Sequence, residues 1–228
     1  MIFSIRKLTL LLIIFVFGSG ANGQSENVTL LSHISLEDLG GGTSGSDLWG
    51  WQDSETGREY ALVGRSNGMS FVDVTDGRNP VFLGELPTHT GDARWRDIKV
   101  YRDHAYVVAD GNGPHGMQIF DLTQLRGVTT PQTWTSTAHY ADNELRNAHN
   151  IAINEETGFA YLVGSLSLSA GGLHILDLSN PTAPVFAGEF TQDGFTHDVQ
   201  VVIYDGPDLD YAGREICLLY TSPSPRDS

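Results

Sequence analysis

The stretch Gly-Met-Ser-Phe-Val-Asp at residues 68–73 returns as Gly-Met-Gln-Ile-Phe-Asp at 116–121 and as Gly-Leu-His-Ile-Leu-Asp at 172–177. The final aspartates are 48 and then 56 residues apart. A second apolar run precedes each copy and begins with a tyrosine, namely Tyr60, Tyr106 and Tyr161. Repeats of this length are typical of four-stranded propeller blades rather than of helical arrays.

Each repeat unit shows the same order of strand signals. An alternating strand opens the unit near residues 47, 97, 149 and 197, and a polar turn leads into the tyrosine run. The Asp-ended run is the third strand, and an Asn-Pro pair introduces the fourth. We expect the aspartates that end the third strands to accept hydrogen bonds from the turning backbone: Asp73, Asp121 and Asp177. The pattern therefore predicts an all-β fragment of a β-propeller, with about three and a half four-stranded antiparallel blades.

These motifs also resemble a known group of proteins. The Asp-Val-Thr-Asp stretch at 73–76 and the Asn-Pro-Val at 79–81, with the strand before them, are similar to LVIVD-repeat proteins. Together with residues 146–151 and 195–200, they resemble the choice-of-anchor B family of exported bacterial proteins. The resemblance covers residues 28–217, and it implies a secreted or surface-anchored β-propeller without defining an activity.

The two ends of the chain differ from the repeats. Arg6 and Lys7 precede the apolar residues 8–17 and a small-residue stretch, which predicts a signal peptide over 1–23. An N-terminal segment at 24–46 then leads into blades at 47–217, and residues 218–228 form a Pro/Ser-rich stretch without the blade pattern. We interpret this last stretch as a non-native or disordered tail. The expected location is secreted or on the cell surface, anchored through a region beyond residue 228.

Composition narrows the class of partner. The formal net charge of −15 disfavours nucleic-acid binding, because phosphate contacts require a basic face. The apolar run at 8–17 is too short to span a bilayer, and no other transmembrane segment is expected. The single cysteine, Cys217, excludes an internal disulfide. These features favour an extracellular module that binds a protein or a glycan, and they leave enzymatic activity undecided.

The openings of the inner strands are the candidate site. In a propeller these strands line the central channel, so their first side chains converge. We expect Asp47, Asp97, His149 and His197 to meet there and to be capable of holding a divalent cation such as calcium, zinc or manganese. The alternative function is then a metal-dependent hydrolase. The other interpretation is that these polar side chains connect neighbouring blades through hydrogen bonds and bind no metal.

The tryptophans have two interpretations. They provide either a stacking surface for carbohydrate or part of the core between blades: Trp49, Trp51, Trp95 and Trp134. Their exposure in a structure separates the two interpretations.

Overall fold

The computed structural model describes residues 28–141, 145–165, 171–192 and 194–220, and the described residues from Leu31 onward belong to one compact unit. Strands provide nearly all of its regular structure, and the described residues contain a single 3₁₀ turn, η1 (Leu122–Leu125), and no α-helix. The expectation of an all-β fold is therefore confirmed. None of the described segments is a helix long and apolar enough to cross a membrane. The predicted signal peptide, residues 1–23, lies outside the described residues.

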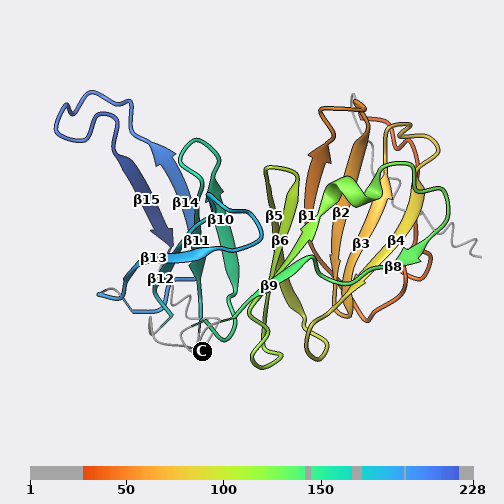
Figure 1. Ribbon diagram of the computed structural model, residues 1–228, viewed down its shortest axis with the longest axis horizontal. Helices are drawn as coiled ribbons and strands as arrows, with labels where there is room; N and C mark the ends of the chain where they lie inside the picture. Colours follow the sequence, from red (N-terminus) through yellow and green to blue (C-terminus); the bar gives the residue numbers. More distant parts are fainter. Residues whose placement is uncertain (1–27, 142–144, 166–170, 193, 221–228) are drawn as a thin grey trace, which may run out of the picture. The chain divides into compact units, whose positions relative to one another are not determined.

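Four sheets follow one another along the chain (Figure 1). Sheet A contains β1 (Gly45–Gln52), β2 (Glu59–Arg65), β3 (Gly68–Asp73) and β4 (Val81–Pro87). Sheet B contains β5 (Trp95–Tyr101), β6 (His104–Asp110), β7 (Met117–Asp121) and β9 (Ala138–Tyr140). Sheet C contains β10 (Asn150–Asn154), β11 (Phe159–Val163), β12 (Leu173–Asp177) and β13 (Val185–Phe190), and sheet D contains β14 (Asp198–Ile203) and β15 (Glu215–Tyr220).

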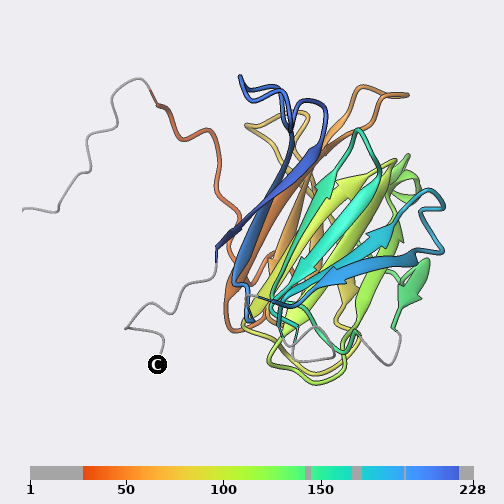
Figure 2. The same cartoon turned by 90° about the vertical axis from the view of Figure 1, so that its left-hand side faces the viewer.

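The sheets begin close to the predicted positions, and their first strands β1, β5, β10 and β14 are neighbours in that order. We call these four the inner strands. The side view shows the sheets stacked one behind another (Figure 2). The arrangement is propeller-like, with two strands in the last sheet, as the half-blade prediction requires.

One connection departs from the expected pattern of four antiparallel strands. After η1 the chain crosses to the edge of sheet A, where β8 (Gln132–Thr133) pairs with β4 in parallel, and it then returns to sheet B as β9. Gly84 allows this close approach, since a Cβ atom there would lie 1.9 Å from the carbonyl oxygen of Gln132. Trp134 follows β8 and packs edge-on against Phe71. Sheet A therefore gains a fifth strand.

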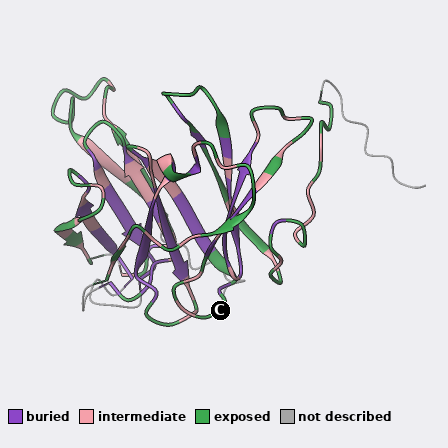
Figure 3. Ribbon diagram, turned by 45° about the vertical axis from the view of Figure 1, so that its right-hand side comes forward, coloured by how far each residue is buried: buried purple, intermediate pink, exposed green. Residues whose placement is uncertain are grey.

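Apolar side chains fill each junction between sheets. Phe71 from sheet A packs against Phe120 from sheet B, with 4.6 Å between ring centroids and the rings tilted by 35°, and both side chains are fully buried. A second cluster joins sheets B and C, and a smaller one joins C and D. Figure 3 shows burial along the strands and exposure in the loops. Burying one large apolar side chain stabilises a fold by roughly 1.5–3 kcal/mol, so these junctions dominate the stability of the four stacked sheets.

The aspartates at the ends of the third strands have the predicted role. Asp73, Asp121 and Asp177 each accept a hydrogen bond from the backbone N–H two residues ahead, at 3.0, 2.9 and 2.7 Å. Each side chain thus closes the turn that follows its strand. Their repetition in three sheets explains why the motif ends in aspartate.

Two further carboxylates connect neighbouring sheets through their inner strands. Asp47 on β1 accepts a hydrogen bond from the N–H of Ile98 on β5, at 3.1 Å. Asp97 on β5 accepts one from the N–H of Ile151 on β10, at 2.8 Å. These bonds join strands that are not paired in a sheet, and we call the two side chains the carboxylate connectors.

The C-terminal stretch divides between strand and residues that are not described. Residues 218–220 complete β15, which pairs with β14 from Glu215 to Tyr220, whereas 221–228 lie outside the described residues. The prediction for the tail thus remains a prediction for its last eight residues.

Replacing Asp97 by alanine tests the connectors. We expect Asp97→Ala to lower the free energy of unfolding by about 1–3 kcal/mol, because the buried N–H of Ile151 loses its acceptor. Denaturant unfolding at low protein concentration measures the change. Asp198→Ala is the matched control, since Asp198 is exposed and bonds only to its own strand; it should change stability by less than about 0.5 kcal/mol. Equal effects of the two substitutions would refute the role of the connector.

Candidate functional site

Two of the predicted histidines meet at the end of the sheets where β5, β10 and β14 begin, which we call the loop end. His149 directly precedes β10 and His197 directly precedes β14. Their ring centroids are 4.6 Å apart, and both residues are partly exposed. The convergence expected from the repeat is therefore present for this pair.

Asp110, at the end of β6, holds His149 in place. Its Oδ2 lies 3.2 Å from Nδ1 of His149, and its Oδ1 accepts bonds from Asn147 Nδ2 at 2.5 Å and the N–H of Gly111 at 2.6 Å. The hydrogen bond from His149 lowers the pKa of Asp110, and the other two donors act in the same direction. Because a carboxylate oxygen can only accept, Nδ1 of His149 donates in this bond, and in the neutral ring the lone pair is then on Nε2.

Two larger aromatic rings flank the histidines. Trp95, at the start of β5, is 49 % exposed, and its ring centroid lies 6.0 Å from that of His149. Tyr220, at the end of β15, stands edge-on to His197 at 5.9 Å. We call Trp95, His149, His197 and Tyr220 the aromatic cluster. Three sheets contribute to it, so the stacking of the sheets creates it.

The other two predicted ligands lie further along the inner strands. Asp97 contacts Nζ of Lys99 at 2.5 Å, and Asp47 lies 3.6 Å from the same atom. Burial raises the pKa of Asp97 to about 7; the neighbouring Asp47 acts in the same direction, whereas Lys99 opposes it. The four predicted residues thus form two groups, Asp47 with Asp97 and His149 with His197. No group of three or more His, Cys, Asp or Glu side chains in the described parts of the chain is arranged to hold a metal ion.

The exposure of the tryptophans separates their roles. Trp51 is buried and Trp134 packs against the core between sheets A and B, so these two are structural. Trp49 and Trp95 are exposed, and the Trp49 ring lies 4.4 Å from Nζ of Lys99. Of the two interpretations, core packing thus applies to Trp51 and Trp134, and a stacking surface is left to Trp49 on β1 and Trp95 on β5.

Sequence reasoning missed Asp110 and Asn147. Asp110 directly follows the second tyrosine run, and Asn147 stands inside the 146–151 motif, but no spacing connects the two. They meet because sheets B and C stack, although they are 37 positions apart in the sequence. The sequence does contain one signal for Asp110. It ends a predicted strand, and the motif with His149 follows in the next repeat.

A second polar cluster is buried between sheets A and B at the same end. Arg96 is only 2 % exposed, donates to Thr88 Oγ1 at 2.9 Å and to the carbonyl of Arg65 at 3.0 Å, and lies 3.5 Å from His115 Nε2. Burial lowers the pKa of Arg96 to about 10, so the guanidinium remains charged at neutral pH. The same burial, with the adjacent Arg96 charge, lowers the pKa of His115 to about 3. His115 is thus held neutral as an acceptor for the arginine.

Comparison with known families agrees with this architecture. Residues 146–192 match the LVIVD repeat. The matched stretch contains all four strands of sheet C, together with Asn147 and His149 of the site. No curated protein matches the chain.

His115 gives the fold a dependence on pH. Its pKa is about 3 when folded and near 6.5 when unfolded, so only the unfolded chain gains a proton between these values. The contribution of neutral His115 to the free energy of unfolding is fully present above pH 6.5 and is lost as the pH falls below that value. Between pH 6.5 and 5 the loss is about 2 kcal/mol.

Denaturant unfolding of the protein and of His115→Gln at both pH values measures this effect, because glutamine can still accept from Arg96 and does not titrate. The difference between the two proteins cancels the opposite contribution of Asp97, whose raised pKa favours folding at lower pH. His33→Gln, at an exposed position, is the control. An unchanged pH profile in His115→Gln would contradict the assignment.

Proposed function

We propose that this chain is an extracellular binding module whose ligand site is the aromatic cluster at the loop end. We further propose that it belongs to the choice-of-anchor B group of exported bacterial LVIVD-repeat proteins. The N-terminal sequence, with its charged start, apolar run and small residues, supports export. The motifs at 146–151 and 195–200 support the group, and both lie at the proposed site.

The aromatic cluster is the observation that carries the binding proposal. An exposed indole, two imidazoles and a phenol gather within contact distance on loops and strand ends, where a packed core does not require them. Fixed aromatic faces provide contact area at little cost in conformational entropy. Asp110 and Asn147 beneath them hold His149 in one orientation, so the surface is preorganised.

The chemistry of the cluster fits a glycan or a polar protein loop. Aromatic faces accept the apolar faces of sugar rings, while the free Nε2 of His149 and the Tyr220 hydroxyl offer hydrogen bonds. The acidic chain supports the exclusion of nucleic acid from the proposed partners.

Trp95→Ala tests this site. We expect it to weaken binding of a soluble oligosaccharide from a panel of neutral and acidic oligosaccharides by at least about tenfold, since truncating a tryptophan that anchors an interface costs about 2 kcal/mol or more. Titration calorimetry measures the affinity. Trp49→Ala is the matched control, because Trp49 is also exposed but stacks with Lys99 away from the cluster. Binding that is lost in the Trp49 variant and retained in the Trp95 variant would refute the location.

The second candidate function is a metal-dependent hydrolase, favoured by the pair of Asp110 and His149. A carboxylate that orients imidazole Nδ1 leaves Nε2 available as a metal ligand or a base. His197 is the adjacent second imidazole. In this proposal both histidines would hold the cation, which lowers the pKa of bound water, whereas Asp47 and Asp97, which the sequence predicts as further ligands, bond instead to Ile98, Ile151 and Lys99.

Calorimetry with zinc, manganese and calcium separates the two functions. If the hydrolase proposal holds, one of these ions binds saturably and the double variant His149→Ala, His197→Ala weakens that binding at least about tenfold. His104→Ala is the control, because His104 begins β6 after the turn that follows Tyr101, and its Nδ1 lies 2.7 Å from the carbonyl of Arg102. Unchanged metal binding in the double variant would exclude a site at these histidines.

A further inference from the structure

Three histidines from separate segments gather at the loop end of the junction between sheets A and B. His89 lies in the loop at 88–94 that joins β4 to β5, His115 lies shortly before β7, and His139 is on β9. The rings of His89 and His139 stack with 3.8 Å between their centroids, and His115 stands edge-on to His89 at 6.2 Å. We call these three side chains the histidine group.

The loop at 88–94 closes over His115, which is fully buried. Thr90 Oγ1 lies 3.1 Å from Nδ1 of His115, and the N–H of His89 donates to Oε1 of Gln118 at 3.3 Å. Both contacts join a loop of sheet A to side chains of sheet B. The loop therefore acts as a cover that keeps His115 away from water.

The charge that acts most closely on the histidine group is positive. Burial, the Arg96 guanidinium and the other two histidines lower the pKa of His115 to about 3. Burial and the neighbouring His139 also lower the pKa of His89. The other charged or titratable side chains of the surrounding segments act on Arg96 or face elsewhere: Asp92, Arg65 with its partner Glu85, Arg94 over the Trp95 ring, and Tyr140 beside His174.

Acid favours an open loop. With the loop closed, His115 stays neutral down to about pH 3, whereas in contact with water it regains its ordinary pKa near 6.5. The advantage of the closed loop is therefore fully present above pH 6.5 and is lost as the pH falls. Between pH 7.5 and 5.0 the equilibrium constant for opening rises about thirtyfold from His115 alone. Charging both stacked rings adds repulsion in the same direction.

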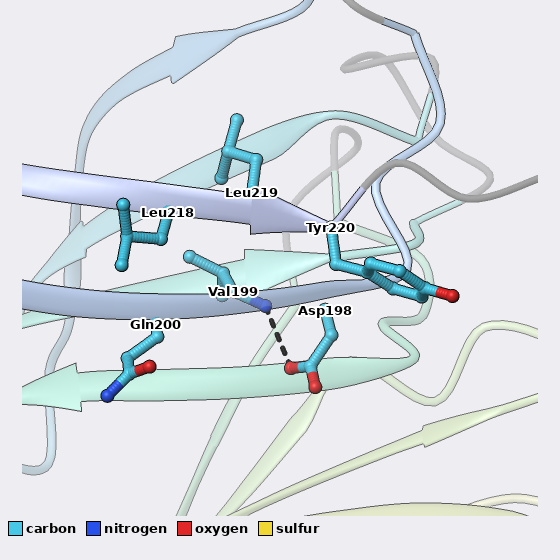
Figure 4. A pocket seen from close by; sticks show the side chains of 6 residues that line it. All are labelled: Asp198, Val199, Gln200, Leu218, Leu219 and Tyr220. Carbon is cyan, nitrogen blue, oxygen red and sulfur yellow. Dashed lines mark hydrogen bonds between the residues drawn. The ribbon is translucent and has the colours of Figure 1, made fainter.

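The loop is also connected to the proposed ligand site. The aromatic cluster extends to Tyr220, which lines a hollow on sheet D (Figure 4), and the histidine group lies apart from that hollow, between sheets A and B. At the other end of the cluster, however, the loop at 88–94 leads directly into Trp95. The Trp95 ring rests on Gly111, where a Cβ atom would lie 3.4 Å from Cζ3. Opening the loop thus releases the backbone that holds Trp95.

We propose that the loop at 88–94 is an acid-operated latch. Proton uptake by the histidine group releases the loop from sheet B and frees Trp95 from its place in the aromatic cluster. The effect on ligand affinity rests on the binding function proposed above, whereas the opening of the loop does not. A bound ligand is then held at neutral pH and released more readily near pH 5.

Hydrogen exchange of the Ala93 amide tests the latch without any ligand. This buried amide donates to the carbonyl of Ser66 at 2.8 Å and anchors the end of the loop. After correction for intrinsic exchange, its protection should fall at least about thirtyfold between pH 7.5 and 5.0. The Leu178 amide, which donates to Gly158 in sheet C at 2.9 Å, reports opening of the whole molecule and should stay more protected than Ala93.

Variants without the titrating rings identify the groups responsible. In the double variant His89→Gln, His115→Gln, the protection of Ala93 should change by less than about threefold over the same range. His33→Gln, at an exposed position, should behave like the unmodified protein. His89→Gln alone, also at an exposed position, leaves the buried side chains in place and should make the fall in protection smaller.

Two results would overturn the latch. Equal protection of Ala93 and Leu178 at pH 5.0 would show that the loop opens only with the whole molecule. A fall in Ala93 protection that persists undiminished in both His89 variants would assign it to other groups.

Calorimetry tests the link to the ligand site separately. An oligosaccharide whose binding depends on Trp95 should bind at least about threefold more weakly at pH 5.0 than at pH 7.5, and less so in the double variant. An equal pH effect on binding in the double variant would contradict the coupling to Trp95. If no oligosaccharide binds at all, the proposed function fails, while the exchange of Ala93 still decides whether the latch exists.

Discussion

The hydrogen bond from the Ile151 N–H to Asp97 is the interaction on which the arrangement of the array most depends. Apolar packing provides most of the stability of the junctions, but it does not determine how far one sheet slides along the next. The connector does, because a single carboxylate oxygen accepts from a single backbone N–H on the neighbouring inner strand at 2.8 Å. Asp47 repeats this device one sheet earlier. Sheets that lack direct strand pairing are thereby held in one register.

The loop end follows from this register. His149 lies two residues before Ile151, so the connector at Asp97 also determines how far His149 projects beyond β10. That position places His149 against Asp110 of the preceding sheet and His197 of the following sheet. A slide of one residue between the sheets, about 3.3 Å along the strands, would separate these side chains. The proposed site is therefore a property of the junctions rather than of any single blade.

The sequence predicts what depends on short spacing and fails where distant segments meet. The strand order, the turn-closing aspartates and the convergence of His149 with His197 all follow from the repeat. The four-residue group does not form, because the strand register aligns Asp97 with Asn150 rather than with His149. Asp110 was missed because its partner lies on another sheet. The parallel strand β8 was missed because a two-residue strand carries no periodicity.

Hydrogen exchange at two backbone amides tests the central role of the connectors most directly. Ile151 and Val199 follow equivalent positions on consecutive inner strands, but Ile151 donates to Asp97 of another sheet and Val199 only to its own neighbour, Asp198. We predict that the Ile151 amide exchanges at least about tenfold more slowly than that of Val199, and that Asp97→Ala removes this difference. Equal exchange rates for the two amides in the unmodified protein would contradict the claim that Asp97 sets the register of the sheets.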